Sequence, residues 1–249
     1  MEYTIHTLSE RPELLPQIER LSEASWPRFL LQGVSGWDLL YGDFAKYQIL
    51  LCDKMGQLIG VGHTVPFYWN NDIADLPETI EEIIARAVSC KNSNIKPNVF
   101  SALAAMVHSE SRGKYMSSAI LLEMKSLAKN YNCQGLLAPV RPTRKADFPL
   151  IDMDEYIQWR RADGSLFDPW LRVHQNLGAS GLAVAKSTMT VTGTIEEWAA
   201  WTGQEFPGSG HYIVDGALQP VAIDQDSNSG VYHDPNYWML HPINPTGAA

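Results

Sequence analysis

One stretch of the chain constrains the fold more than any other. Residues 99–107 are mostly small and apolar, which is typical of a strand buried on both faces. A polar loop follows at residues 109–118, and from Ser118 onward apolar residues recur at helical spacing. The sequence therefore predicts a central strand that leads through a polar loop into an amphipathic helix, which indicates an α/β protein.

The predicted loop is suited to binding an anion. Free backbone N–H groups and the positive end of the helix dipole converge where a helix begins. Arg112 and Lys114 add positive charge there, and Ser117 and Ser118 offer hydroxyl donors. An ordinary strand-to-helix connection with solvated basic side chains accounts for the same residues. Spacing alone does not decide between the two interpretations.

Periodicity and turn residues predict the other elements. Strands are expected at residues 3–7, 47–52, 58–68, 136–140, 182–185 and 188–192, with short strands near 212–214, 218–223 and 231–238. Helices are expected at residues 12–24, from Pro169 to a stop at Gly178, and from a capping box at Thr194 to Gly203. We interpret the chain as one domain, with a core at 1–193, insertions at about 70–97 and 143–167, and an extension at 194–249 packed on the core.

Composition argues against several classes of protein. The 249 residues suffice for a sizeable core, and no segment approaches the roughly 18 apolar residues of a membrane span. The first residues lack the sections of a signal peptide, and Cys52, Cys90 and Cys133 are spaced unlike a disulfide framework or zinc ribbon. With 19 basic and 28 acidic residues the net charge is −9, which disfavours nucleic acid. We expect a cytoplasmic protein without a membrane, nucleic-acid or metal partner.

The segment VHSESRGKYMSSAILLEM, residues 107–124, resembles the cofactor-binding motif of the GNAT superfamily of acyltransferases. That motif is a strand ending in valine, an Arg-Gly-x-Gly-x-Gly/Ala loop and a helix. Arg112 and Gly113 match it, whereas Tyr115 stands at the second glycine and Ser117 at the third Gly or Ala. Glycines let the backbone approach a diphosphate closely. Tyr115 therefore either weakens the site or turns its side chain outward.

The order of the predicted elements also resembles that of GNAT proteins, over most of residues 1–193. The resemblance implies a mixed, mostly antiparallel central sheet flanked by helices, with a splayed central strand pair and extra C-terminal strands. It implies acetyl-CoA or another acyl-CoA as co-substrate, with its pantetheine arm in the splay. The cofactor-binding residues that it implies are Met106, Val107, His108, Arg112, Gly113, Lys114, Tyr115, Met116, Ser117 and Ser118.

Three further segments, APVRPTRK, DPWLRVHQNLGA and GTIEEWAAWTG, resemble a bacterial GNAT subgroup that has no assigned substrate. GNAT proteins usually carry an asparagine after the second strand of the splayed pair. Thr143 and Arg144 occupy that region here. This departure removes one expected contact with pantetheine.

The resemblance implies a candidate catalytic acid. GNAT enzymes often carry a tyrosine four residues before the glycine that ends the helix after the second strand, and His174 stands there, before Gly178. An imidazolium can protonate the departing sulfur of coenzyme A. The alternative is a histidine that caps a helix end. His63 is a candidate base or simply a packed residue, and residues 99–107 contain no carboxylate, so no base is assigned.

The function implied is that of an N-acetyltransferase. It would move an acetyl or other acyl group from acyl-CoA directly to a primary amine of a small molecule, in a ternary complex. A homodimer is one option for its assembly. Two alternatives stay open: a non-catalytic module that binds or senses acyl-CoA through a degenerate diphosphate loop, and an α/β protein whose loop binds no nucleotide.

Overall fold

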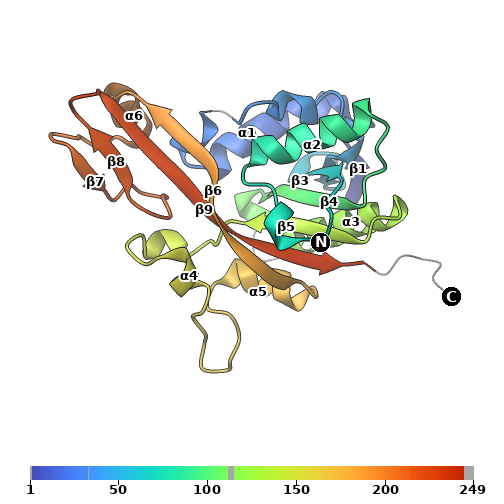
Figure 1. The fold of residues 1–249 in the computed structure, drawn as a ribbon. Coiled ribbons are helices and arrows are strands. Elements are labelled where there is room, and N and C mark those ends of the chain that lie inside the picture. Colours follow the sequence, from blue (N-terminus) through green and yellow to red (C-terminus); the bar gives the residue numbers. More distant parts are fainter. Residues whose placement is uncertain (1, 33, 112–114, 244–249) are drawn as a thin grey trace.

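The computed structural model describes residues 2–32, 34–111 and 115–243 (Figure 1). Its strands are β1 (Thr4–Thr7), β2 (Ile49–Cys52), β3 (Leu58–Phe67), β4 (Val99–Val107), β5 (Gly135–Val140), β6 (Ser180–Gly193), β7 (Gly210–Tyr212), β8 (Val221–Asp224) and β9 (Ser229–Pro242). Its α-helices are α1 (Leu15–Ser25), α2 (Ile80–Asn92), α3 (Met116–Asn130), α4 (Met153–Tyr156), α5 (Pro169–Asn176) and α6 (Ile195–Thr202). The central strand has the predicted bounds.

The strands form one mixed sheet. Its order is β1-β2-β3-β4-β5-β9-β8-β7, and β6 pairs with the free side of β9. Within the described residues, β4 and β5 run parallel and the other paired strands run antiparallel. The predicted fold class, a mostly antiparallel sheet flanked by helices with extra C-terminal strands, is confirmed.

The two central strands part after a short paired stretch. Register between β4 and β5 covers only Val99 with Gly135 through Ser101 with Leu137. On its other side β4 stays paired with β3, where the register shifts by one residue and leaves Leu103 as a bulge. A bulge bends its strand and increases the local twist. The predicted splayed strand pair is therefore present.

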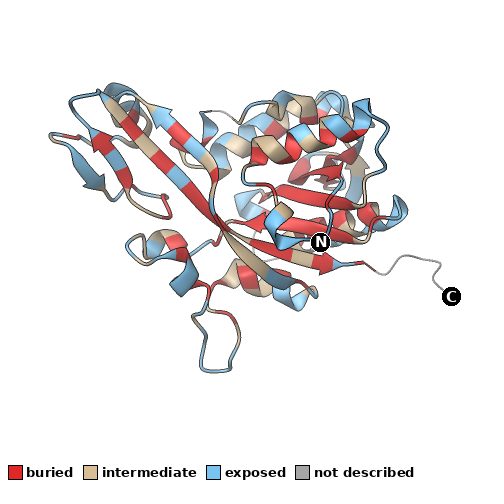
Figure 2. Ribbon diagram, in the orientation of Figure 1, coloured by how far each residue is buried: buried red, intermediate tan, exposed pale blue. Residues whose placement is uncertain are grey.

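Helices cover both faces of the sheet. Successive residues of β3 point to opposite faces and contact different helices. Val61 belongs to a buried cluster with Ile18 of α1, whereas Gly62 points to the opposite face. A methyl group at Gly62 would lie 2.5 Å from the Cγ2 of Ile120 and 2.6 Å from the Cε of Met124, both on α3. Glycine at this position is thus what lets α3 pack close to the sheet. The strands under these helices are mostly buried (Figure 2).

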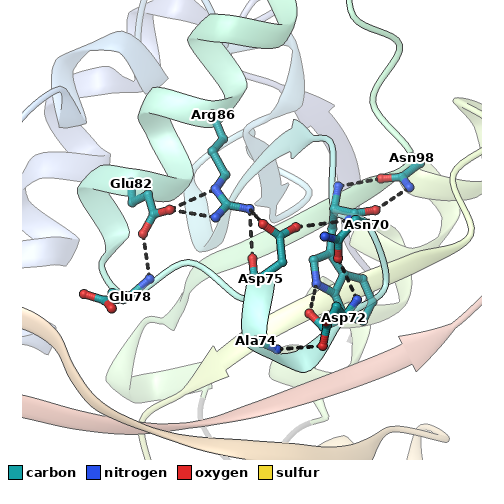
Figure 3. Close-up of polar contacts among 9 residues, drawn as sticks. Asn70, Asp72, Ala74, Asp75, Glu78, Glu82, Arg86 and Asn98 are labelled. Atoms are coloured by element: carbon teal, nitrogen blue, oxygen red, sulfur yellow. Dashed lines mark hydrogen bonds and ion pairs between the residues drawn. The ribbon is translucent and has the colours of Figure 1, made fainter.

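A polar network fixes the connection from β3 to α2 (Figure 3). Asn98 accepts from the backbone N–H of Trp69 at 2.8 Å and donates to its carbonyl at 2.7 Å. Arg86 of α2 forms ion pairs with Glu82 at 2.7 Å and with Asp75 at 3.2 Å. The buried face of α2 belongs to the main core. Residues 70–97 therefore provide a covering helix of the main sheet.

The C-terminal residues add to the same sheet. The second half of β9 lies between β5 and β6, and its first half pairs with β8 and β6 (Figure 1). A second core cluster lies here, in which Phe29 contacts Trp198 and Tyr232 with ring centroids 5.6 and 5.4 Å apart. Because Phe29 lies in the 3-10 helix after α1, Arg28–Leu31, the extension packs against the N-terminal region. The proposed division at residue 193 stays an interpretation.

Two local predictions can be compared with the observed elements. The capping box at the start of α6 is present, with Thr194 accepting from the backbone of Glu197 at 3.2 Å and Glu197 accepting from that of Thr194 at 2.7 Å. The two strands predicted at 182–192 are one strand, β6. Its register with β9 shifts between Ala185 and Met189, which interrupts the alternation without ending the strand. In the part of the chain that the structure describes, no helix combines the length and apolar character needed to traverse a bilayer.

Candidate active site

A cleft of about 690 Å³ opens where β4 and β5 part. It lies between the end of β4, the start of α3 and the start of α5. The residues that line it include Trp26, Ala105, Met106, Val107, Met116, Ser117, Arg141, Thr143, Trp170 and Val173. Within the described residues, β4 from Ala102 onward has no partner strand on this side. The cleft has the size, the apolar walls and the exposed strand edge that a pantetheine arm requires.

Tyr115 is the first described residue after the predicted diphosphate loop. It has φ +60°, precedes the first residue of α3, and its side chain is 84% exposed. The left-handed conformation is the one that glycine adopts without cost, and a tyrosine there is strained by about 1 kcal/mol. The ring is therefore turned outward rather than into the cleft. Arg112, Gly113 and Lys114, also predicted to bind the cofactor, lie outside the described residues.

The other predicted cofactor-binding residues divide into three groups. Met106, Val107, Met116 and Ser117 line the cleft. Ser118 lies half-buried in the first turn of α3 and is not part of the lining. The backbone N–H of His108 donates to the carbonyl of Ile59 at 2.9 Å, so it is already satisfied. His108 lines an adjoining cavity of about 540 Å³, at the ends of α1 and β4.

A second cavity, of about 370 Å³, adjoins the cleft. The two share Trp26 and Arg141. Most of the second cavity is apolar, with walls from α1, the segment after it, β4 and the C-terminal strands. The polar groups that line it are Glu19, Ser22, Glu23, Tyr41, Arg141, Asp234 and Asn236. Ligands bound in these two cavities would therefore lie on either side of one shared wall.

Arg141 and Asp234 form a buried ion pair at that wall. The Nε of Arg141 lies 3.0 and 3.1 Å from the two carboxylate oxygens, and its Nη2 donates to the carbonyl of Gly216 at 2.7 Å. Tyr232 and Asn236 also donate to Asp234, at 2.6 and 3.3 Å. Burial alone would lower the pKa of Arg141, but the nearby Asp234 outweighs it and the pKa is raised. The guanidinium therefore stays charged.

His174, the predicted acid, lies away from the cleft surface. Its side chain is buried in α5, and its Nδ1 lies 2.9 Å from the Nε2 of His241. Burial and the neighbouring His241 lower the pKa of His174 to about 3, so the ring is neutral at neutral pH. Trp170 and Val173, from the same helix, line the cleft instead. These contacts do not support the imidazolium donor that the sequence suggested.

His63 and the cysteines are packed residues. His63 is fully buried, its Nδ1 lies 3.0 Å from the Oε1 of Gln48, and burial lowers its pKa to about 3. Its ring contacts those of Trp37 and Tyr41, which line the second cavity, while His63 itself does not. The three cysteines are buried and free. None of them lines the cleft or the second cavity.

The sequence did not single out the residues at the shared wall. Arg141 and Asp234 are 93 positions apart and meet only because β9 pairs with β5. The available signals were an arginine at the end of a buried strand and an Asp within a segment rich in aromatic residues. Nothing in the spacing of these two residues along the sequence indicates that they would meet.

Comparisons with known proteins agree with this geometry. No protein-family model matches the chain. The arginine N-acetyltransferase avaD of Aspergillus versicolor is 27% identical over 275 residues, which cover 97% of this chain and 94% of that protein. The loading GNATL domain of CurA from Lyngbya majuscula has a TM-score of 0.64 at 15% identity, covering 97% of this chain and 98% of that one.

A further solved structure, the GphF GNAT-like decarboxylase in complex with isobutyryl-CoA, has a TM-score of 0.60 at 14% identity. It covers 98% of this chain and 100% of that chain. These two structures show the fold, and the parted strands with a cleft between them fit an acyl-CoA. Because the sequence similarity also runs along nearly the whole of an N-acetyltransferase, the comparisons together support a GNAT-type, acyl-coenzyme A-dependent N-acetyltransferase.

Proposed function

We propose that the enzyme transfers an acetyl group from acetyl-CoA to a primary amine of a small cationic molecule. The observation that carries the proposal is the pair of adjoining cavities that share Trp26 and Arg141. One cavity opens between the splayed strands, where a thioester would enter. The other has the volume of a small metabolite, and acidic side chains line it.

The thioester side of the site is assigned from the cleft. The pantetheine arm lies along the unpaired edge of β4 at Met106 and Val107, and the diphosphate lies at the first turn of α3. Ser117 lines the cleft at that turn and offers a hydroxyl donor. Backbone N–H groups at a helix start favour an anion there. The outward-turned ring of Tyr115 does not itself fill this turn, which favours an enzyme over a degenerate binding module.

The acceptor side is assigned from charge. Glu19 and Glu23 are exposed residues of α1 that line the second cavity, and the chain as a whole carries a net charge of −9. Both features attract a cation. Trp26, Trp37 and Tyr41 supply aromatic walls on which a planar cation can rest. The name of the Aspergillus relative, an arginine N-acetyltransferase, supports an acceptor of this kind.

The transfer is direct, because the two ligands meet without an intervening nucleophile. The neutral amine nitrogen attacks the thioester carbonyl carbon, a new C–N bond forms and the C–S bond breaks. The nitrogen gives up a proton and the departing sulfur takes one up. Since His174 is buried and neutral, we assign most of the rate to holding the amine against the thioester.

Release of free coenzyme A thiol measures this function. Purified protein is incubated with acetyl-CoA and a panel of amines that includes arginine, agmatine, a polyamine and a neutral alkylamine. We expect thiol release that depends on the amine, strongest for cationic amines, with intersecting lines in two-substrate kinetics. Release that is slow and indifferent to every amine would reject transfer and favour an acyl-CoA-binding module. Calorimetric titration with coenzyme A then separates that module from a protein that binds no nucleotide.

A further inference from the structure

The second cavity, in which we place the acceptor amine and which is called the acceptor cavity below, carries different polar groups at its rim and at its deep end. Its exposed rim carries Glu19 and Glu23 of α1, whereas the polar residues Arg141, Asp234 and Asn236 line its deeper part. Asp234 and Asn236 are only 2% and 3% exposed. Because Arg141 also lines the cleft between β4 and β5, a thioester in that cleft would approach the acceptor from the deep end. A bound acceptor must therefore place its reacting amine deep and its remote group at the rim.

Arg141 has donor capacity left at the deep end. Its Nε is engaged by Asp234 and its Nη2 by the carbonyl of Gly216, and no hydrogen bond from Nη1 occurs within the described residues. The side chain is 18% exposed and keeps its charge. Asp234 and Gly216 hold the guanidinium plane in place, so the free edge is preorganised for a planar anion. A carboxylate is the group that fits such an edge.

Asn236 supplies a hydrogen-bond acceptor atom next to Arg141. Its side-chain Oδ1 is buried and has no hydrogen-bond partner in the part of the chain that the structure describes. The amide orientation is fixed, because Nδ2 donates to the Asp234 carboxylate, which can only accept, and contacts the hydroxyl of Thr188. A buried acceptor without a donor is costly. Because this oxygen is almost fully buried, an N–H of a ligand in the cavity would reach it only after the Asn236 side chain shifts.

These observations describe a carboxylate and an N–H group side by side at the deep end and a cation at the rim. We infer that the acceptor is an α-amino acid with a cationic side chain, whose carboxylate binds Arg141 and whose α-amine is acetylated. The inference rests on the proposed function and adds the atom that reacts. The α-nitrogen bonds to the acetyl carbon, the C–S bond breaks, and the proton lost from nitrogen balances the one gained by coenzyme A sulfur.

The opposite orientation is disfavoured by charge. A guanidinium or ammonium side chain at the deep end would lie against the charged Arg141. Asp234 would not offset this repulsion, because its carboxylate already accepts hydrogen bonds from Arg141, Tyr232 and Asn236. The ligand's carboxylate would then face Glu19 and Glu23 at the rim. Both ends of the ligand would meet groups of like charge.

Substrate analogues test the inference on the unaltered enzyme. Arginine is compared with agmatine and argininamide, which lack the carboxylate, and with citrulline, which replaces the cation by a neutral urea of the same shape. We expect kcat/KM for arginine to exceed that for agmatine and for argininamide by roughly 10- to 100-fold. We expect a smaller preference, about 3- to 10-fold, for arginine over citrulline, because the rim is exposed. Tandem mass spectrometry of the product should place the acetyl group on the α-nitrogen.

Two variants separate recognition from folding. Arg141→Lys keeps the charge and loses the planar fork, so the arginine-to-agmatine ratio of kcat/KM should fall towards one. Glu23→Gln should reduce only the arginine-to-citrulline ratio, whereas Glu155→Gln, at an exposed residue of α4 outside the cavity, should leave both ratios unchanged. If Arg141→Lys does not fold, the analogue series still decides.

The outcomes distinguish the inference from the function on which it rests. Equal use of arginine and agmatine, or acetylation of the guanidinium, would overturn the α-amino acid assignment and leave acetyl transfer intact. No amine-dependent release with any compound would reject acetyl transfer itself. A preference for agmatine would show that the deep end receives an amine without a carboxylate.

Discussion

The indole Nε1 of Trp26 donates a hydrogen bond to the sulfur of Met106, with the two atoms 3.0 Å apart. Trp26 is the C-cap of α1, and Met106 lies near the end of the central strand. Trp26 lines both cavities and Met106 lines the thioester cleft. This contact therefore ties the end of α1 to the central strand beside the wall that the two cavities share.

Replacing the sulfur should loosen this wall. Met106→Leu keeps a similar volume but leaves the indole N–H without its acceptor, so we expect the free energy of unfolding to fall by about 1 kcal/mol. The KM for acetyl-CoA should rise several-fold, because Trp26 is then free to shift into the cleft. Urea unfolding and initial rates measure the two effects. Met124→Leu, at a buried methionine of α3 that lines neither cavity, should leave KM unchanged.

Tyr115 gives a prediction about strain. Because its φ is +60° and its ring is exposed, Tyr115→Gly should raise the free energy of unfolding by about 1 kcal/mol and keep or improve coenzyme A affinity. Asn228→Gly is the matched control, since Asn228 has φ +47° and asparagine tolerates this conformation. Calorimetric titration measures binding. A loss of affinity in Tyr115→Gly would show instead that the tyrosine ring contacts the cofactor.

Three buried histidines predict loss of stability in acid. Burial lowers the pKa of His63 and His174 to about 3 and that of His241 to about 4, whereas an unfolded chain protonates histidine near pH 6.5. Between these pKa values the unfolded state binds more protons than the folded state. The contribution of the three histidines to the free energy of unfolding is therefore complete above about pH 7 and falls as the pH drops. Each residue contributes a slope of up to about 1.4 kcal/mol per pH unit.

Urea unfolding between pH 7.5 and pH 5 measures that slope. His241→Leu should reduce it by about one third, because one of the three groups no longer titrates. His6→Gln, at a histidine outside the three, serves as the control. A midpoint that does not change between these pH values would contradict the neutral, buried state of the three rings.

His174 can be tested as an acid separately from its packing. Because it is buried against His241, His174→Phe should lower the melting temperature while changing kcat less than 10-fold at pH 7, with the shape of the pH profile of kcat unaltered. The profile and the thermal transition are measured on the same preparation. A drop of 100-fold or more, with loss of the basic limb of the profile, would restore His174 as the proton donor.

The ion pair at the shared wall should matter for stability as well as for activity. Asp234→Asn leaves the guanidinium of Arg141 without its buried counter-charge, and we expect a loss of about 3 kcal/mol in the free energy of unfolding. Arg86→Gln breaks more exposed pairs with Glu82 and Asp75 and should cost about 1 kcal/mol or less. Equal losses in the two variants would contradict the burial assigned to Asp234.

The fold was predictable because its signals are local. The apolar run at 99–107, the polar loop after it and the capping box at Thr194 each lie within a few residues of the structure that they produce. The strand β6 was predicted as two strands because its bulge against β9 interrupts the alternation, and a bulge depends on the partner strand.

The site was predictable only in part, for the same reason. Ser117 and Met106 follow from the motif around the central strand, and both line the cleft. Arg141, Asp234 and Asn236 come from two strands far apart in the sequence, and their meeting is decided by the pairing of β5 with β9. His174 was chosen from its place in a motif, which carries no information about whether the side chain faces the cleft or the interior.

The strand β9 has a consequence for when the enzyme becomes active during its synthesis. Asp234 and Asn236 lie in this strand, the last one of the described residues, and it must pair with β5, which leaves the ribosome about one hundred residues earlier. The second cavity thus gains Asp234 and Asn236 only after β9 has been synthesised and has paired with β5.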